Sequence, residues 1–166
     1  PGFFIEDIDD LAKRLNTVVV KIQGLKPENL DTLNFDKMAL FQYMVGNTDW
    51  HVQNLHNIRL IKFNDFTKPL AVPLPYDFDY AGLVNASYAV PGESISIANV
   101  RERYYLGLCR KPEQYVSLLK IFREKKDEIY RVINESSSLT NFDKNDVTKY
   151  IDGFYKIIET DKSAGR

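Results

Sequence analysis

Apolar residues recur at helical spacing in two stretches of the N-terminal half, 7–15 and 34–45. In the second stretch Asn34 is a residue type that caps helices at their start. Gly46 follows the last apolar position, where glycine readily takes the left-handed conformation that ends a helix. The pattern therefore predicts a short helix and then a longer one that stops at Gly46.

Three other stretches are predicted to be strands, at 17–22, 58–63 and 69–74, and the first of them is rich in β-branched residues. The last two are separated by polar residues 64–68, which predicts a β-hairpin. Because proline cannot donate a backbone hydrogen bond to a neighbouring strand, the prolines of the third stretch place it at a sheet edge.

The C-terminal half begins with a long irregular stretch, 80–96, and then reads as helical. Apolar spacing predicts helices over 100–108, 112–136 and 141–158. Two arginines in the first turn of the 100–108 segment are interpreted as part of a solvated face. The fold class expected from these elements is mainly α with a small β-hairpin, an α+β domain covering residues 1–160.

Composition narrows the function classes. The 166 residues are 44% hydrophobic and 27% charged, with a formal net charge of −1. Without a basic excess to neutralise phosphates, a nucleic-acid or membrane-surface binder is disfavoured. No apolar run is long enough to span a membrane.

Two further sequence features concern the compartment of the protein and the start of its chain. A single cysteine, Cys109, excludes an intrachain disulfide and slightly favours the cytoplasm without requiring it. The chain starts at Pro1, and its only methionines are Met38 and Met44. We therefore expect a domain cut from a longer protein, whose leader is not visible in this sequence.

Two polar segments bracket the predicted hairpin, residues 46–54 before it and 75–82 after it. The first contains D-x-H-x-x-N at Asp49, His51 and Asn54. The second begins Pro-Tyr-Asp-Phe-Asp. Loops at the two sides of a hairpin converge in space, and carboxylate and amide oxygens are the ligands that Mg²⁺ prefers.

These motifs resemble those of atypical protein-kinase-like enzymes. HipA-like, CotH-like and lipid kinases carry D-x-H-x-x-N, and D-F-[DE]-Y-A resembles the segment after the hairpin in choline-kinase-like enzymes. The stretch 41–110 is also similar to an uncharacterised group of bacterial proteins with G-N-T-D-W and P-Y-D-F-D-Y-A-G motifs. The resemblance implies a kinase-like C-terminal lobe. Its expected parts are a hinge segment at 3–6, a catalytic loop at 46–57, a hairpin at 58–74, a metal-binding loop at 75–82, helices over 99–158 and a frayed tail at 161–166.

The resemblance assigns a role to each matching residue. Asp49 corresponds to the catalytic aspartate, which orients the attacking hydroxyl or accepts its proton. His51 corresponds to a loop histidine that braces the loop or touches phosphate. Asn54 and Asp77 correspond to magnesium ligands, and Asp79 backs up Asp77 or binds a second ion.

Two departures limit these assignments. The interval between Asn54 and Asp77 is longer than in typical protein kinases, so Asn57 is an alternative ligand. No Gly-rich phosphate loop is present among the eight glycines. The nucleotide-clamping N-lobe is therefore expected to be missing, and this chain alone is not expected to turn over ATP.

The function expected for the whole protein is an ATP- and Mg²⁺-dependent phosphotransferase with an unknown acceptor. Alternative functions are a pseudokinase or binding module of the same fold, or another metal-dependent transferase that uses Asp77-x-Asp79. Structural interpretations also remain open. Asp49 and Asn54 would then cap a loop, Asp77 and Asp79 would form an Asx turn or calcium-type site, and His56 would lie on the surface or cap.

Overall fold

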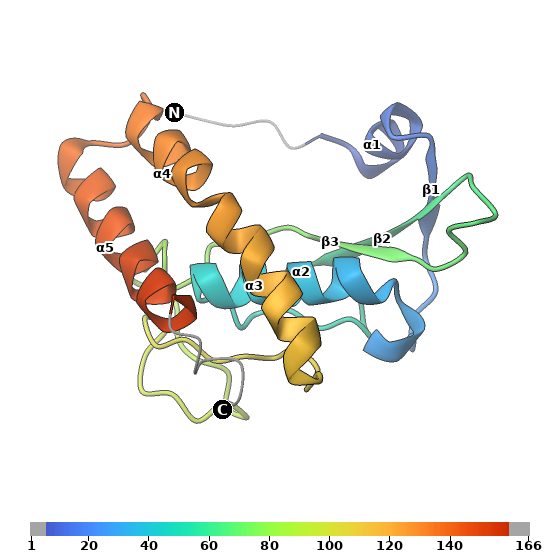
Figure 1. Ribbon diagram of the computed structural model, residues 1–166, viewed down its shortest axis with the longest axis horizontal. Helices are drawn as coiled ribbons and strands as arrows, with labels where there is room; N and C mark the ends of the chain where they lie inside the picture. Colours follow the sequence, from blue (N-terminus) through green and yellow to red (C-terminus); the bar gives the residue numbers. More distant parts are fainter. Residues whose placement is uncertain (1–5, 160–166) are drawn as a thin grey trace.

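The computed structural model describes residues 6–159, which form an α+β domain built around one central helix and a small antiparallel sheet (Figure 1). The fold class predicted from the sequence is confirmed at this level. The elements in chain order are α1 (Ile8–Arg14), β1 (Thr17–Val20), the 3₁₀ turn η1 (Pro27–Asn29), α2 (Thr32–Val45), β2 (Ile58–Phe63), β3 (Val72–Pro75), α3 (Pro112–Glu124), α4 (Lys126–Glu135) and α5 (Asn141–Ile158).

The sheet contains the predicted hairpin and one further strand. Its order is β1-β2-β3, with both pairs antiparallel. Thr17 lies opposite Phe63 in the first pair, and Ile58 lies opposite Pro75 in the second. The proline-containing strand β3 is at the edge, as expected from its missing donors. The sheet thus fixes the start of β2 beside the end of β3.

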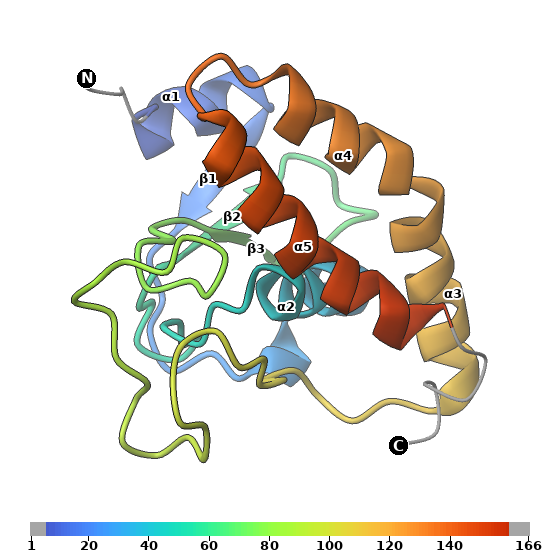
Figure 2. The same ribbon diagram turned by 90° about the vertical axis from the view of Figure 1, so that its left-hand side faces the viewer.

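Helix α2 runs through the centre of the molecule and separates two apolar cores (Figure 2). Its cap is Asp31, whose carboxylate accepts hydrogen bonds from the backbone N–H of Asn34 at 2.9 Å and from the Asn34 side chain at 2.9 Å. The prediction that Asn34 caps this helix is therefore wrong by one turn. Gly46 ends the helix with φ of 69°, as predicted.

Both faces of α2 are buried, which explains why its sequence lacks a clear polar face. Phe35 and Met38 pack with Trp50 and Leu60 in the core beneath the sheet. On the other face α2 packs against helices α3 and α5. That second core consists of Leu40, Met44, Val45, Ala81, Leu118, Leu119, Phe122, Ile151, Phe154, Tyr155 and Ile158.

The predicted helix over 100–108 is wrong, because this segment has no regular secondary structure. Arg101 and Arg103 instead lie on the ring of Tyr150 in α5, with guanidinium carbons 4.6 and 3.9 Å from its centroid. Side chains two residues apart share a face in an extended chain and diverge in a helix. The contact of both arginines with one ring is therefore incompatible with a helix over this segment.

The expectation that the two arginines form a solvated face is also wrong, because both bind other parts of the protein. Arg103 donates hydrogen bonds to the backbone oxygens of Met44 and Tyr150, which joins the end of α2 to α5. Arg101 makes a two-bond ion pair with Asp146, at 2.8 and 3.0 Å. These contacts attach the irregular segment to the helical half of the protein.

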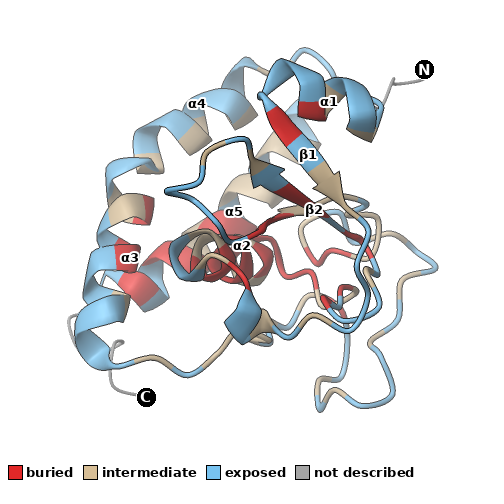
Figure 3. Ribbon diagram, turned by 90° about the vertical axis from the view of Figure 1, so that its right-hand side faces the viewer, coloured by how far each residue is buried: buried red, intermediate tan, exposed pale blue. Residues whose placement is uncertain are grey.

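The predicted helix over 112–136 is divided into α3 and α4 at Lys125, whose φ and ψ of −90° and 0° lie outside the helical region. The bend lets α3 pack against α2 while α4 packs against α5. Figure 3 shows exposed residues along the outer side of both helices. Most of the expected hinge segment 3–6 and the tail 161–166 lie outside the described residues. No helix within 6–159 is both long and apolar enough to cross a membrane.

Two glycines let the loops that flank the hairpin meet. The N–H of Gly82 donates to the oxygen of Gly46 at 3.0 Å, and the N–H of Leu83 donates to the oxygen of Val45 at 2.9 Å. A Cβ at position 82 would lie 2.2 Å from the oxygen of Val100 and 2.5 Å from the Tyr150 hydroxyl. The close approach of the loops therefore requires glycine at position 82.

We predict that Gly82→Ala destabilises the protein by about 1–3 kcal/mol, the cost typical of inserting a methyl group into a packed interior. The φ of Gly82 is not positive, so the effect is steric and not conformational. Gly92→Ala is the matched control, because its Cβ would meet only Ile95 at 3.7 Å. Urea denaturation measures both variants. Equal stability of the two would contradict the close approach at Gly82.

Candidate functional site

The hairpin brings the two polar segments together at one end. Asn57 is the last residue before β2, and Asp77 follows β3 after one intervening residue. The N–H of Tyr76 donates to the oxygen of Asn57 at 3.1 Å, which continues the pairing of the strands beyond Ile58 and Pro75. The register of the sheet therefore places Asn57 opposite Tyr76, the residue directly before Asp77.

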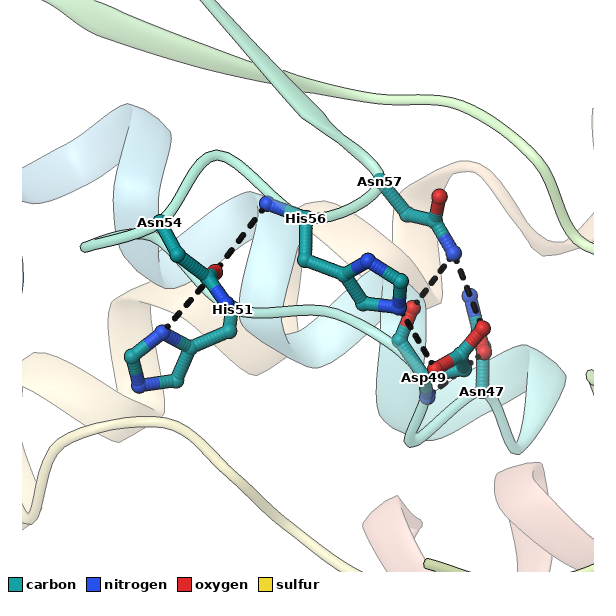
Figure 4. A network of polar contacts seen from close by, with 6 residues as sticks. All are labelled: Asn47, Asp49, His51, Asn54, His56 and Asn57. Atoms are coloured by element: carbon teal, nitrogen blue, oxygen red, sulfur yellow. Dashed lines mark hydrogen bonds and ion pairs between the residues drawn. The ribbon is translucent and has the colours of Figure 1, made fainter. Parts of the chain in front are cut away.

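Asp49 is held by three side chains of its own loop (Figure 4). The Asn57 amide nitrogen donates to the Asp49 carboxylate at 2.9 Å and to its backbone oxygen at 2.8 Å. The Nε2 atom of His56 lies 2.8 Å from the other carboxylate oxygen. Asn47 accepts a hydrogen bond from the Asp49 N–H at 3.0 Å. Both carboxylate oxygens of Asp49 are thus engaged, which fixes its orientation.

His51 and Asn54 lie on the opposite side of the loop from the Asp49 carboxylate (Figure 4). The Asn54 side-chain oxygen is 3.1 Å from His51 Nδ1 and accepts from the His56 N–H at 3.2 Å. His51 and His56 also exchange two backbone hydrogen bonds of 3.0 Å. The pair braces the turn, and the expected convergence of Asn54 with Asp49 is not found. Asn57, and not Asn54, is the asparagine that contacts the Asp49 carboxylate.

Several residues at the site have left-handed backbone conformations. The φ angles are 56° at Leu55, 52° at Asn57 and 60° at Asp77. Asn and Asp tolerate this region better than other residues with a side chain, whereas a leucine there is strained. Such conformations cluster at functional sites, because the surrounding structure must hold them against their cost.

The electrostatics of Asp77 link the two loops. Partial desolvation raises the pKa of Asp77 above its usual value, and the charge and hydrogen bonding of Asp79 raise it further. The negative charge of Asp49 adds to this effect, while His56 opposes it. Asp49, Asp77 and Asp79 therefore lie in one region of crowded negative charge.

Three tyrosines border this region. The hydroxyl of Tyr88 donates to Asp79 at 3.1 Å, and its ring lies 5.9 Å from that of Tyr80. The hydrogen bond to Asp79 raises the pKa of the Tyr88 hydroxyl, and desolvation raises it further. On the other flank, the Arg59 guanidinium donates to the Tyr76 hydroxyl at 2.6 Å. The site thus has an acidic centre with an aromatic border.

The donor set is compatible with a hard divalent cation. Carboxylates of Asp77 and Asp79 and the amide oxygen of Asn57 are ligands that Mg²⁺ accepts. Between residues 6 and 159, no three His, Cys, Asp or Glu side chains already form a metal-binding group. Mg²⁺ keeps most of its waters and needs only one or two protein carboxylates, so a closed cage of side chains is not required.

Some of the site was not identified from the sequence. His56 lies on the surface, as expected, and it also contacts the Asp49 carboxylate at 2.8 Å, which the sequence did not predict. Its position directly before Asn57 and the start of the hairpin is the one signal that pointed to it. Asn47 is buried, and its amide nitrogen lacks a hydrogen-bond partner among the described residues.

Comparison of the chain with models of known protein families, with curated proteins and with solved structures found no match.

We predict that Asp77→Asn stabilises the fold at pH 7. Because the folded-state pKa of Asp77 lies above its unfolded value, ionisation costs stability as the pH rises through that interval. Asparagine removes this charge and tolerates the positive φ. Thermal unfolding should show a gain at pH 7 of less than about 1 kcal/mol, because the group is exposed. The gain should shrink as the pH is lowered toward ~4, the usual value for aspartate.

Asp65→Asn is the control with the opposite sign. Hydrogen bonds from the Thr67 side chain and backbone hold the pKa of Asp65 below its usual value. Its contribution to stability is present above the unfolded pKa and is lost as the pH falls through the folded one. This variant should therefore be less stable than the wild type at pH 7. Destabilisation by Asp77→Asn at pH 7 would refute the crowding of charge.

Proposed function

We propose that this chain is the C-terminal lobe of a Mg²⁺- and ATP-dependent phosphotransferase of protein-kinase-like fold. The acceptor is a hydroxyl group whose parent molecule is not assigned. The nucleotide-clamping lobe is, in this proposal, supplied outside the 166 residues, because the sequence has no Gly-rich phosphate loop.

The observation that carries the proposal is the hydrogen bonding of Asn57 to Asp49 at the end of the hairpin that Asp77 follows. The hairpin brings Asn57 next to Tyr76, which precedes Asp77, and Asn57 donates two hydrogen bonds to Asp49. A catalytic carboxylate and two metal-ligand candidates thereby lie at one end of one hairpin. This is the set of parts that phosphoryl transfer requires from a kinase C-lobe.

Asp49 would position the acceptor hydroxyl and take its proton as the new O–P bond forms, while the bond from the γ-phosphorus of ATP to its bridging oxygen breaks and ADP leaves. The carboxylate is oriented by His56 on one oxygen and by Asn57 on the other, so little reorganisation precedes the reaction. His56 is exposed enough to exchange its contact with an incoming hydroxyl, since half of its side-chain surface is accessible (50%).

Asn57 would serve two partners with its two amide atoms. Its nitrogen points to Asp49, and its oxygen points away from that carboxylate (Figure 4). The oxygen of Asn57 and the carboxylates of Asp77 and Asp79 would hold Mg²⁺. When bound, the ion supplies positive charge that offsets the charge on the phosphates. In this proposal Asn57, and not Asn54, fills the ligand role that the motif suggested.

Magnesium binding by this chain provides the first test. We predict that MgCl₂ at about 20-fold above its dissociation constant raises the melting temperature by roughly 4–7 °C. Asn57→Ala and Asp77→Asn should abolish most of this shift. Asn54→Ala is the matched control and should retain it, because its side chain faces His51. A shift that depends on Asn54 and not on Asn57 would refute the assignment.

The catalytic part of the proposal requires the natural full-length protein. Phosphotransfer from ATP should fall at least about 100-fold in Asp49→Asn and in Asp77→Asn, with folding retained by circular dichroism. ATP binding without turnover in the wild type would indicate a binding module. Turnover of a sugar nucleotide with Mn²⁺ would indicate a different transferase, and absence of any ATP binding would refute the nucleotide assignment.

A further inference from the structure

Residues 83–100, called here the latch loop, form a long excursion closed tightly at its neck (Figure 2). The loop contains no helix or strand. At the neck, Arg101 donates to the Gly82 oxygen at 3.1 Å and pairs with Asp146 of α5. The Leu83 N–H donates to the oxygen of Val45, the last residue of α2, at 2.9 Å. The neck is therefore part of the packed domain and holds the loop ends in place.

The middle of the latch loop is attached to the candidate site through one side chain. Tyr88 donates to Asp79 at 3.1 Å and rests its ring against Tyr80. The other hydrogen bonds of the loop middle are local, such as Ala89 to Ala86 and Ile95 to Gly92. Tyr88 is 60% exposed, so its attachment depends on these two contacts and not on burial.

Asp79 is the group that this attachment shares with the proposed metal site. Its carboxylate accepts the Tyr88 hydrogen bond while it also interacts with the carboxylate of Asp77, the nearest candidate ligand. A cation bound between Asp77 and Asp79 draws electron density from the Asp79 carboxylate, which makes that carboxylate a weaker acceptor for the Tyr88 hydroxyl. Cation binding at Asp79 therefore weakens the Tyr88 hydrogen bond.

We propose that Tyr88 is a latch that ties the latch loop to Asp79, and that binding of a divalent cation at Asp77 and Asp79 releases it. The second half of this inference rests on the proposed function. Loss of the hydrogen bond leaves the loop middle held only by the ring contact of Tyr88 with Tyr80, and the neck stays attached to α2 and α5. Occupation of the metal site is thereby coupled to the attachment of the latch loop.

Limited proteolysis at Glu93 tests the latch without any metal. This glutamate is exposed within the latch loop, and a glutamate-specific protease followed by mass measurement reports cleavage there. In buffer with a chelator, Tyr88→Phe should be cut about fivefold faster than the wild type, the factor expected for one lost hydrogen bond. Tyr80→Phe is the matched control and should be cut at the wild-type rate, because it retains the ring contact. Equal rates for Tyr88→Phe and the wild type overturn the latch.

The same assay with MgCl₂ tests the release. Cleavage at Glu93 should accelerate in the wild type, and it should be insensitive to Mg²⁺ in Tyr88→Phe and in Asp79→Asn. A wild-type protein that gains thermal stability from Mg²⁺ but shows unchanged cleavage overturns the coupling while leaving the proposed metal site intact. Absence of any thermal shift refutes the metal site, and the metal-free comparison still decides whether Tyr88 is a latch.

Discussion

The packing of Tyr150 against the crossing of Gly46 and Gly82 is the contact on which the rest of the structure depends. Here the end of α2 meets the segment after the hairpin, and the close backbone approach leaves no space for a Cβ. Arg101 and Arg103 cover the same ring and bind backbone oxygens on both sides. The helical half thus holds the two polar loops at a fixed separation, although it contributes no side chain to the acidic centre.

The composition of the site follows from strand pairing more than from motif spacing. Antiparallel pairing fixes Ile58 opposite Pro75, so the residue directly before β2 lies opposite the residue directly after β3. Asn57 thereby meets Tyr76, the residue before Asp77. Asn54 has the interval that the resemblance suggested, yet it lies within a turn where its oxygen is used by His51 and by a backbone N–H.

The sequence predicted what depends on local patterns. The β-hairpin, its proline-containing edge strand and the end of α2 at Gly46 could all be predicted. Each depends on a signal that acts within a few residues: a polar turn between two strand-like stretches, the missing N–H of proline, or the left-handed conformation of glycine. The segment 100–108 was misread, since its apolar spacing suits a helix while two arginines bind the distant Tyr150. The contact of His56 with Asp49 likewise depends on how the loop turns, which no spacing rule specifies.

The pairing of β1 with β2 also bears on how the domain folds. Val20 lies opposite Leu60. Pairing of the two strands therefore closes a long segment of chain that contains α2 and the loop of Asp49. Closing a segment of that length loses chain entropy before the hydrogen bonds between β1 and β2 can form. Contacts between residues so distant in sequence therefore slow folding. Helix α2 and the hairpin need only local contacts. We therefore infer that docking of β1 onto the hairpin is a late step, which follows formation of the loop around Asp49.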